Sequence, residues 1–189
     1  MTRWLGRLLL RLGGWRVESA LAEVPGLVIV IAPHTSNWDF VWLLLAKWQL
    51  GLHPAWLGKH TLFRPPLGWF MRRLGGIPVD RSRRGDFVSQ AVAAFGERNG
   101  TMLALAPEGT RRRTDYWKSG FYEIAREADV PVQLVGIDHG RRRVLIGPWR
   151  MLSGDRDADM AWVAGFFAQV SGRRPENAGP VRLRPRHPR

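Results

Sequence analysis

A histidine and an aspartate lie five positions apart, at a point where a strand pattern gives way to a helix pattern. The histidine is His34 and the aspartate is Asp39. Residues 27–32 are an unbroken apolar run rich in β-branched side chains, which predicts a strand buried on both faces. Residues 40–46 are apolar, and good helix formers continue to residue 50. His34 therefore follows the carboxyl end of a strand, where open α/β sheets bind their ligands.

This placement suits a general base and the carboxylate that orients it. On one regular helix, side chains five positions apart point about 140° away from each other, so the pair requires His34 in the loop and Asp39 in the first helical turn. The helix dipole keeps a first-turn carboxylate ionised. An ionised Asp39 fixes the tautomer of His34 and stabilises the imidazolium that forms when the ring takes up a proton.

Structural interpretations of the same residues remain open. Ser36 and Asp39 have the spacing of a capping box, which would give the aspartate a purely structural role. A lone histidine such as His34 is also more often a satisfied structural residue than a catalytic one. The residues at the other strand ends bear on the choice between these interpretations.

Residues 107–111, Pro-Glu-Gly-Thr-Arg, follow a second apolar strand pattern at residues 101–106. Gly109 allows an unusual backbone angle or the close approach of a ligand. Thr110 can donate hydrogen bonds, and Arg111 has the planar guanidinium that suits phosphate. The alternative is a tight turn with a Glu–Arg pair and a solvated arginine run. In this block the candidate ligand-binding residues are Gly109, Thr110 and Arg111, and Glu108 belongs to the alternative Glu–Arg pair.

Two further strand ends carry basic residues. Lys59 follows a short strand pattern at residues 55–58. Arg81 follows another at residues 77–79, whose proline suggests a position at a sheet edge or at a strand end. Because parallel strands bring such ends together at one edge of a sheet, we expect these residues to converge on one site. The remaining histidines, at positions 53, 60, 139 and 187, lack the spacing of metal ligands, so we expect no metal site. No nucleotide-cofactor motif is present.

Composition narrows the class of protein. The chain has 189 residues, which suits one domain, and 29 Lys and Arg against 16 Asp and Glu give a net charge of +13. Such a charge predicts an anionic partner: a phosphate-bearing ligand, an anionic membrane or a nucleic acid. The absence of cysteine excludes disulfides and thiolate chemistry. No apolar run reaches the length of a membrane span, and arginines interrupt the apolar N-terminus, so we expect no signal peptide and a cytoplasmic location.

Strand and helix patterns alternate along the chain. This order predicts an α/β fold, a single domain with a mostly parallel mixed sheet flanked by helices. We expect a basic amphipathic helix within residues 1–20, the domain at residues 21–170, and a disordered basic tail at residues 171–189. The strands are expected at 27–32, 55–58, 77–79, 101–106, 131–137 and 144–146, and helices at 1–15, 40–50, 65–74, 86–98, 119–128 and 157–170.

The N-terminal helix pattern has two interpretations. Its leucines at positions 5, 8, 9 and 12 share one face, and its arginines at positions 3, 7 and 11 share another. Such a helix suits the interface of an anionic membrane, to which the ten tryptophans of the chain are also suited. An ordinary helix that docks its leucines on the core has the same pattern. Leu10 lies off the apolar face.

From Val24 to Ile137, the chain resembles the glycerolipid acyltransferases, whose members include the lysophospholipid and 1-acylglycerol-3-phosphate acyltransferases. Four blocks occur in order: His34-x-x-x-x-Asp39; Lys59 through Gly75-Gly76-Ile77-Pro78-Val79-Asp80-Arg81; Pro107 to Arg111; and Val130-Pro131 to Ile137. Pro33 stands where the family commonly has asparagine, and Ala106 where it often has an aromatic residue. These departures suggest a divergent branch.

The resemblance implies a glycerol-3-phosphate acyltransferase-like fold and a reaction. His34, oriented by Asp39, would act as general base on the hydroxyl of a lysophospholipid such as 1-acylglycerol-3-phosphate, which attacks acyl-coenzyme A or acyl-acyl carrier protein. By analogy, the acceptor would be bound by Glu108, Gly109, Thr110, Arg111, Arg81 and Lys59. No cofactor is expected beyond the acyl donor. The protein would work peripherally on the anionic, cytoplasmic face of a membrane.

Two other functions remain open. A thioesterase or lipid hydrolase would use the same His–Asp pair with water as the acceptor. A basic nucleic-acid-binding protein would explain the charge and the aromatic residues, although no known nucleic-acid-binding motif is visible. The identity of the lysolipid, the acyl-chain length and the choice between coenzyme A and acyl carrier protein are not determined by the sequence.

Overall fold

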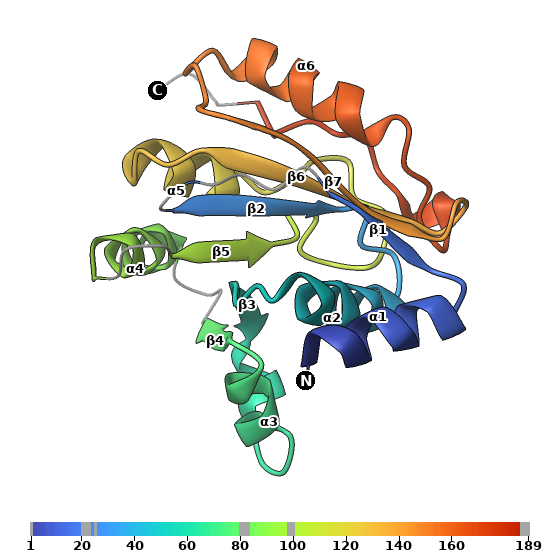
Figure 1. The fold of residues 1–189 in the computed structure, drawn as a ribbon. Helices are drawn as coiled ribbons and strands as arrows, with labels where there is room; N and C mark the ends of the chain where they lie inside the picture. Colours follow the sequence, from blue (N-terminus) through green and yellow to red (C-terminus); the bar gives the residue numbers. More distant parts are fainter. Residues whose placement is uncertain (1, 20–23, 25, 80–83, 98–100, 186–189) are drawn as a thin grey trace.

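A seven-stranded sheet forms the centre of the protein (Figure 1). The computed structural model describes residues 2–19, 24, 26–79, 84–97 and 101–185. The strand order is β1-β7-β6-β2-β5-β3-β4, and every pairing is parallel except that of β6 with β7. The strands are β1 (Arg16–Glu18), β2 (Leu27–Ala32), β3 (Ala55–Lys59), β4 (Gly76–Val79), β5 (Met102–Leu105), β6 (Val132–Asp138) and β7 (Arg143–Arg150). The predicted mostly parallel mixed sheet is therefore confirmed.

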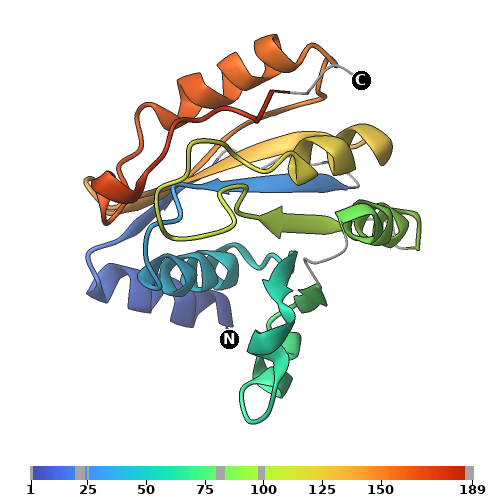
Figure 2. The same cartoon turned by 180° about the vertical axis from the view of Figure 1, so that it is seen from behind.

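Helices cover both faces of the sheet (Figures 1 and 2). They are α1 (Thr2–Leu12), α2 (Trp38–Leu50), α3 (Gly68–Arg73), α4 (Arg84–Glu97), α5 (Gly120–Glu127) and α6 (Arg156–Phe167), with short 3₁₀ turns at His60–Phe63 and Pro175–Asn177. One face packs against α1 and α2, and the other against α4, α5 and α6. None of the helices in the described ranges has the length and apolar character needed to cross a membrane.

The sequence of β2 is continuously apolar because both faces of the strand are buried. Val28 and Val30 belong to the core beneath α5 and α6, whereas Leu27 and Ile29 belong to the core beneath α1 and α2. Because side chains alternate between the faces of a strand, burial of both faces leaves no polar position. β2 lies between β6 and β5, so its carboxyl end, where His34 follows, opens at the middle of the sheet.

The sheet ends at β4, which pairs only with β3 in the described chain. Pro78 within β4 has no backbone N–H to give to a further strand, and the predicted edge position of this strand is confirmed. β1 at the opposite edge was not predicted. Its three residues, Arg-Val-Glu, are too few and too polar to form a strand pattern, and β1 exists because it pairs with β7.

α1 docks on the core by a different side from the one its sequence pattern suggests. Leu10 is 1% exposed and Gly6 is buried against α2, whereas Leu5, Leu9 and Leu12 are 39%, 37% and 75% exposed. Of the two interpretations of this helix, docking of its leucine face on the core is therefore wrong: α1 packs on α2 through the small Gly6, which allows a closer approach than the leucines would. The apolar stripe is left facing outward.

The contact at Gly6 leads to a stability prediction. A Cβ atom at this position would lie 2.7 Å from the carbonyl oxygen of Leu45 and 2.7 Å from the backbone nitrogen of Gln49, both in α2. Gly6→Ala should therefore lower the free energy of unfolding by about 1–3 kcal/mol, since this overpacking outweighs the gain in helix propensity. Urea unfolding will measure the change. Gly165→Ala in α6 is the control, because its Cβ would meet nothing within 4 Å; equal stability of both variants would contradict this packing.

Residues 171–185 are not disordered, contrary to the sequence-based expectation. Leu183 forms a parallel bridge with Trp117, and the backbone N–H of Trp117 donates to the carbonyl oxygen of Arg182 over 2.8 Å. Val181 and Leu183 also pack against the core. The low apolar content of this segment is offset by backbone hydrogen bonds to loops distant in sequence. Residues 186–189 lie outside the described chain.

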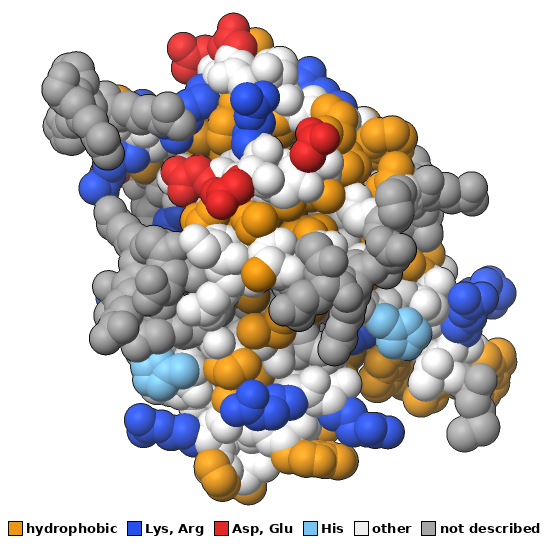
Figure 3. All heavy atoms as spheres, turned by 90° about the vertical axis from the view of Figure 1, so that its left-hand side faces the viewer, with side chains coloured by type: hydrophobic (Ala, Val, Ile, Leu, Met, Phe, Trp, Pro, Cys, Tyr) orange, Lys and Arg blue, Asp and Glu red, His pale blue; other side chains and the backbone are white. Residues whose placement is uncertain are grey.

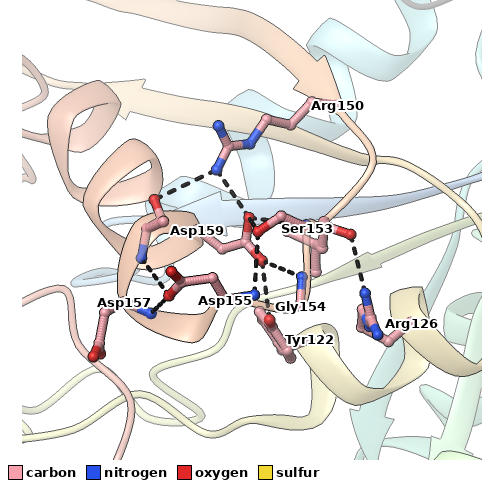
Figure 4. A network of polar contacts seen from close by, with 10 residues as sticks. Tyr122, Arg126, Arg150, Ser153, Gly154, Asp155, Asp157 and Asp159 are labelled. Atoms are coloured by element: carbon pink, nitrogen blue, oxygen red, sulfur yellow. Dashed lines mark hydrogen bonds and ion pairs between the residues drawn. The ribbon is translucent and has the colours of Figure 1, made fainter.

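A polar network joins α5, α6 and the end of β7 (Figure 4). The Asp159 carboxylate is fully buried and accepts hydrogen bonds from the Tyr122 hydroxyl, the Ser153 hydroxyl and backbone N–H, and the Gly154 backbone N–H. Arg150 forms an ion pair with it at 2.9 Å. Burial would raise the pKa of Asp159, but these hydrogen bonds lower it. The network is a structural one, since Asp159 does not line the cavity that contains His34.

Candidate active site

His34 and Asp39 meet at the junction of β2 and α2, as their spacing predicts. His34 lies in the loop, and Asp39 is the second residue of α2. The His34 Nδ1 atom lies 3.2 Å from Asp39 Oδ2, an ion-pair distance without the alignment of a hydrogen bond. The histidine side chain is 20% exposed and the aspartate side chain is fully buried. The pair has the geometry of a partly accessible base with a buried orienting carboxylate.

The Asp39 carboxylate is held by three groups. Oδ2 accepts the backbone N–H of Ser36 at 2.8 Å, and Oδ1 lies 2.8 Å from Nε2 of His139. Burial would raise the pKa of Asp39, but the contacts with His139, His34 and the Ser36 N–H lower it to about 2. The Ser36 bond joins the two residues whose spacing suggested a capping box, although the N-cap residue of α2 is Asn37. The contact of Asp39 with the Ser36 backbone and its contact with the His34 ring therefore coexist.

His139 is a site residue that the sequence analysis missed. It follows β6, which pairs with β2, and so it reaches the same end of the sheet as His34. The rule that singled out His34, a chemically active side chain directly after a predicted strand, also applies to His139. Its sequence distance from Asp39 concealed the contact.

Glu108 reaches the site from the loop after β5. Its Oε2 atom accepts the backbone N–H of His34 at 2.7 Å, and the residue is only 6% exposed. Burial raises the pKa of Glu108 to about 7, against the lowering effect of that hydrogen bond. No ion pair joins it to Arg111 among the described residues. Glu108 thus clamps the loop that carries His34.

The next residues of this block line the same cavity as His34. Gly109 has a φ of +68°, which confirms the expected unusual backbone angle. The Thr110 hydroxyl accepts the backbone N–H of Arg112 at 3.2 Å, and Arg111 is exposed. The structure does not place the two remaining candidates. Lys59 ends β3 with its side chain outside the described atoms, and Arg81 lies outside the described residues altogether.

A cavity of about 1370 Å³ extends from His34 into the protein. The loops after β2 and β5 supply most of its polar residues, which include Glu108 and Arg111. Its remaining lining is largely apolar. α2, β3 and the α3 segment, residues 61–74, contribute to it with Phe40, Leu44, Trp56, Leu67 and Met71. A volume above the usual range for small-ligand pockets, with this lining, suits a long apolar ligand with a polar end.

Fold and site together define an α/β enzyme in which a histidine–carboxylate pair at a strand end faces an apolar cavity. The chain belongs to the acyltransferase family: a sequence model of this family, described as Acyltransferase, matches residues 18–138, which is more than half of the chain. The protein is therefore an acyltransferase. The family match contains both His34 and Asp39, together with the whole block of residues 107–111.

A solved structure shares the fold. It is described as the crystal structure of the 1-acyl-sn-glycerophosphate (LPA) acyltransferase, PlsC, from Thermotoga maritima. It superimposes with a TM-score of 0.57 at 19% sequence identity, over 87% of this chain and 74% of that chain. A search of curated proteins gave no match.

Proposed function

We propose that the protein is a lysophospholipid O-acyltransferase. It would move a fatty acyl group from acyl-coenzyme A or acyl-acyl carrier protein to the hydroxyl of a lysophospholipid such as 1-acylglycerol-3-phosphate. The observation that carries the proposal is the position of His34, which contacts an ionised Asp39 and lines a large apolar cavity. The activity printed for the Thermotoga maritima protein supports the choice of acceptor.

In the proposed reaction, Nδ1 of His34 carries its proton toward Asp39, which leaves Nε2 free to act as the base. Nε2 takes the proton of the acceptor hydroxyl while the oxygen attacks the thioester carbonyl. The C–S bond then breaks, and the imidazolium returns the proton to the departing thiolate. Asp39 stabilises the imidazolium between these steps, so that no covalent acyl-enzyme is required.

The acyl chain and the phosphate of the substrates would bind in different parts of the cavity. The apolar surface from α2 and the α3 segment would receive an acyl chain. The phosphate would lie near Gly109, Thr110 and Arg111, where an exposed guanidinium offers a planar pair of donors. Glu108 would act through its bond to the His34 loop, since its buried carboxyl group accepts the His34 backbone N–H. By resemblance alone, Lys59 and Arg81 would add positive charge.

The test is product analysis with the wild-type protein. Labelled acyl-coenzyme A and acyl-acyl carrier protein would be incubated with a panel of lysolipids and also with no acceptor. We expect a labelled diacyl lipid with at least one lysolipid. Release of free fatty acid alone, unchanged by lysolipid, would overturn the transferase and assign the His–Asp pair to a hydrolase.

We also propose that the protein works at the anionic cytoplasmic leaflet of a membrane. α1 and the α3 segment both lie below the sheet in Figures 1 and 2, and hydrophobic side chains occur together with Lys or Arg at that end in Figure 3. Trp4 and Leu12 of α1, and Leu67, Trp69 and Phe70 of the α3 segment, are 44–75% exposed. Flanking arginines at positions 3, 7, 11, 64, 72 and 73 suit anionic lipid headgroups.

Replacing Trp69 and Phe70 with serine should weaken binding to anionic vesicles by about tenfold or more, because each exposed aromatic ring contributes apolar area to the bilayer interface. Vesicle co-sedimentation will measure the affinity. Trp149→Ser, which removes a 44% exposed tryptophan from β7, is the control and should bind normally. Equal binding by all three proteins would place the membrane-contacting surface elsewhere.

A further inference from the structure

Two histidines contact the same carboxylate, but only one of them reaches the substrate cavity. His34 and His139 lie on opposite oxygens of Asp39, at 3.2 Å and 2.8 Å respectively. His34 lines the cavity, whereas His139 does not. The side chain of His139 is 14% exposed. The two rings therefore have different roles: only His34 is available to a substrate proton.

We infer that His139 is a positioning residue for the acyl-transfer reaction, which it serves by fixing the Asp39 carboxylate in the orientation that His34 requires. The inference rests on the proposed function, in which His34 is the base. Without a partner on Oδ1, the carboxylate could rotate about its Cβ–Cγ bond. With Nε2–H of His139 on Oδ1, the second oxygen stays between the Ser36 N–H and the His34 ring.

His139 is itself held from two other directions. The ring of Trp15 packs edge-on against it with 4.9 Å between ring centroids, and Trp15 in turn stacks on Trp42 of α2 at 4.5 Å. The backbone N–H of His139 donates to the carbonyl oxygen of Ser171 at 2.8 Å. A side chain that is fixed by packing on one side holds its hydrogen-bond partner more firmly than a mobile one would.

The C-terminal segment contributes to the same arrangement. Ser171 binds the backbone of His139, and three residues later the backbone N–H of Arg174 donates to the Thr35 hydroxyl at 3.2 Å. Gly172 lies against Thr35 as well, where a Cβ atom would be only 2.8 Å from the hydroxyl oxygen. One segment thus contacts both histidine-bearing loops, and this keeps His34 and His139 at a fixed separation across Asp39.

Few titratable side chains lie close to the Asp39 carboxylate in the described chain. The titratable side chains in contact with the carboxylate are His34 and His139, and Glu108 is next, through its bond to the His34 backbone. Since burial alone would raise the pKa of Asp39, removal of the His139 donor should make this carboxylate easier to protonate. A protonated Asp39 would no longer stabilise the His34 imidazolium.

The test uses two substitutions at one position. His139→Leu removes the donor, and His139→Gln keeps an N–H that can reach Asp39. We expect His139→Leu to lower kcat for acyl transfer about 10- to 100-fold, with KM for both substrates changed less than twofold, because a hydrogen bond to a buried charged group is lost. His139→Gln should retain activity within about threefold of the wild type. His53→Leu, at an exposed histidine, is the control.

A double substitution separates positioning from general damage to the fold. In an Asp39→Asn background, His139→Leu should lower kcat by less than threefold, because the group that it positions has already lost its charge. Equal activity of His139→Leu and wild type, an equal loss in His139→Gln, or a full additional loss in the double variant would each overturn the inference. A wild-type protein without transferase activity would instead contradict the proposed function.

A measurement that does not depend on activity distinguishes a failure of the inference about His139 from a failure of the proposed function. Carbon NMR of the Asp39 carboxyl group reports its titration directly in the full chain. In the wild type this carboxylate should stay ionised down to a pH of about 2. In His139→Leu its titration should move up by about one pH unit or more, and in His139→Gln by less than half of that. An unchanged titration in His139→Leu would overturn the inference even if the enzyme were inactive.

Discussion

His34→Ala is expected to abolish most acyl transfer, with kcat lowered about 10²- to 10⁴-fold. The imidazole is the group placed to take the acceptor proton, since it contacts an ionised carboxylate and lines the cavity. KM should change little, because the ring contributes base strength rather than binding area. Rates of labelled diacyl lipid formation under saturating donor will measure the effect.

The stability of this variant decides how the loss is interpreted. The His34 side chain is partly exposed, and its Nδ1 atom makes no aligned hydrogen bond, so its removal should cost little stability. We expect a thermal unfolding midpoint within a few degrees of the wild type. His60→Ala, at an exposed histidine in the 3₁₀ turn after β3, is the matched control and should leave kcat unchanged. Activity of His34→Ala within threefold of the control would remove His34 from the mechanism.

The His34–Asp39 pair was predictable because all of its determinants are local. An apolar strand, a short loop and the first turn of a helix fix the two side chains within six residues, and the structure confirms this placement. The strand pattern also predicted the sheet, because burial on both faces leaves a continuous apolar signature in β2 and β6.

The remaining features depend on contacts between distant segments. The partner of Asp39 at His139 is separated from it by 100 positions, and no local pattern records such a contact. The fold of residues 171–185 depends on backbone hydrogen bonds, which are almost independent of side-chain type. The sequence left the docking of α1 open, and it did not indicate the docked side, because close packing through Gly6 does not use the more apolar face of the helix.

Glu108 gives the protein an unusual dependence of stability on pH. The pKa of this buried carboxyl group is raised from 4.5 to about 7 in the folded chain. Between these values the folded protein keeps a proton that the unfolded chain has released, so the stabilising contribution is complete below pH 4.5 and is lost as the pH rises through 7. The loss amounts to about 3 kcal/mol for a shift of this size. Asp39 acts in the opposite direction, losing its contribution as the pH falls from about 4 to 2.

Glu108→Gln should remove the effect of Glu108 alone. The amide oxygen of glutamine can accept the His34 backbone N–H as the carboxyl group does, but it has no charge to desolvate. We expect the variant to match the wild type at pH 4 to 5 and to be more stable by about 2–3 kcal/mol at pH 8, as measured by urea unfolding. Glu127→Gln, at an exposed position in α5, should show no such difference. Parallel pH profiles of Glu108→Gln and wild type would contradict the buried, proton-holding carboxyl group.

The activity of the same variant distinguishes a clamp from a proton-carrying group. If Glu108 only holds the His34 loop through the 2.7 Å bond, glutamine should suffice, and kcat should stay within about threefold of the wild type. If transfer requires the proton or the charge of Glu108, kcat should fall even though the protein becomes more stable at pH 8. Stability and rate would then change in opposite directions, a result that a loss of packing cannot produce.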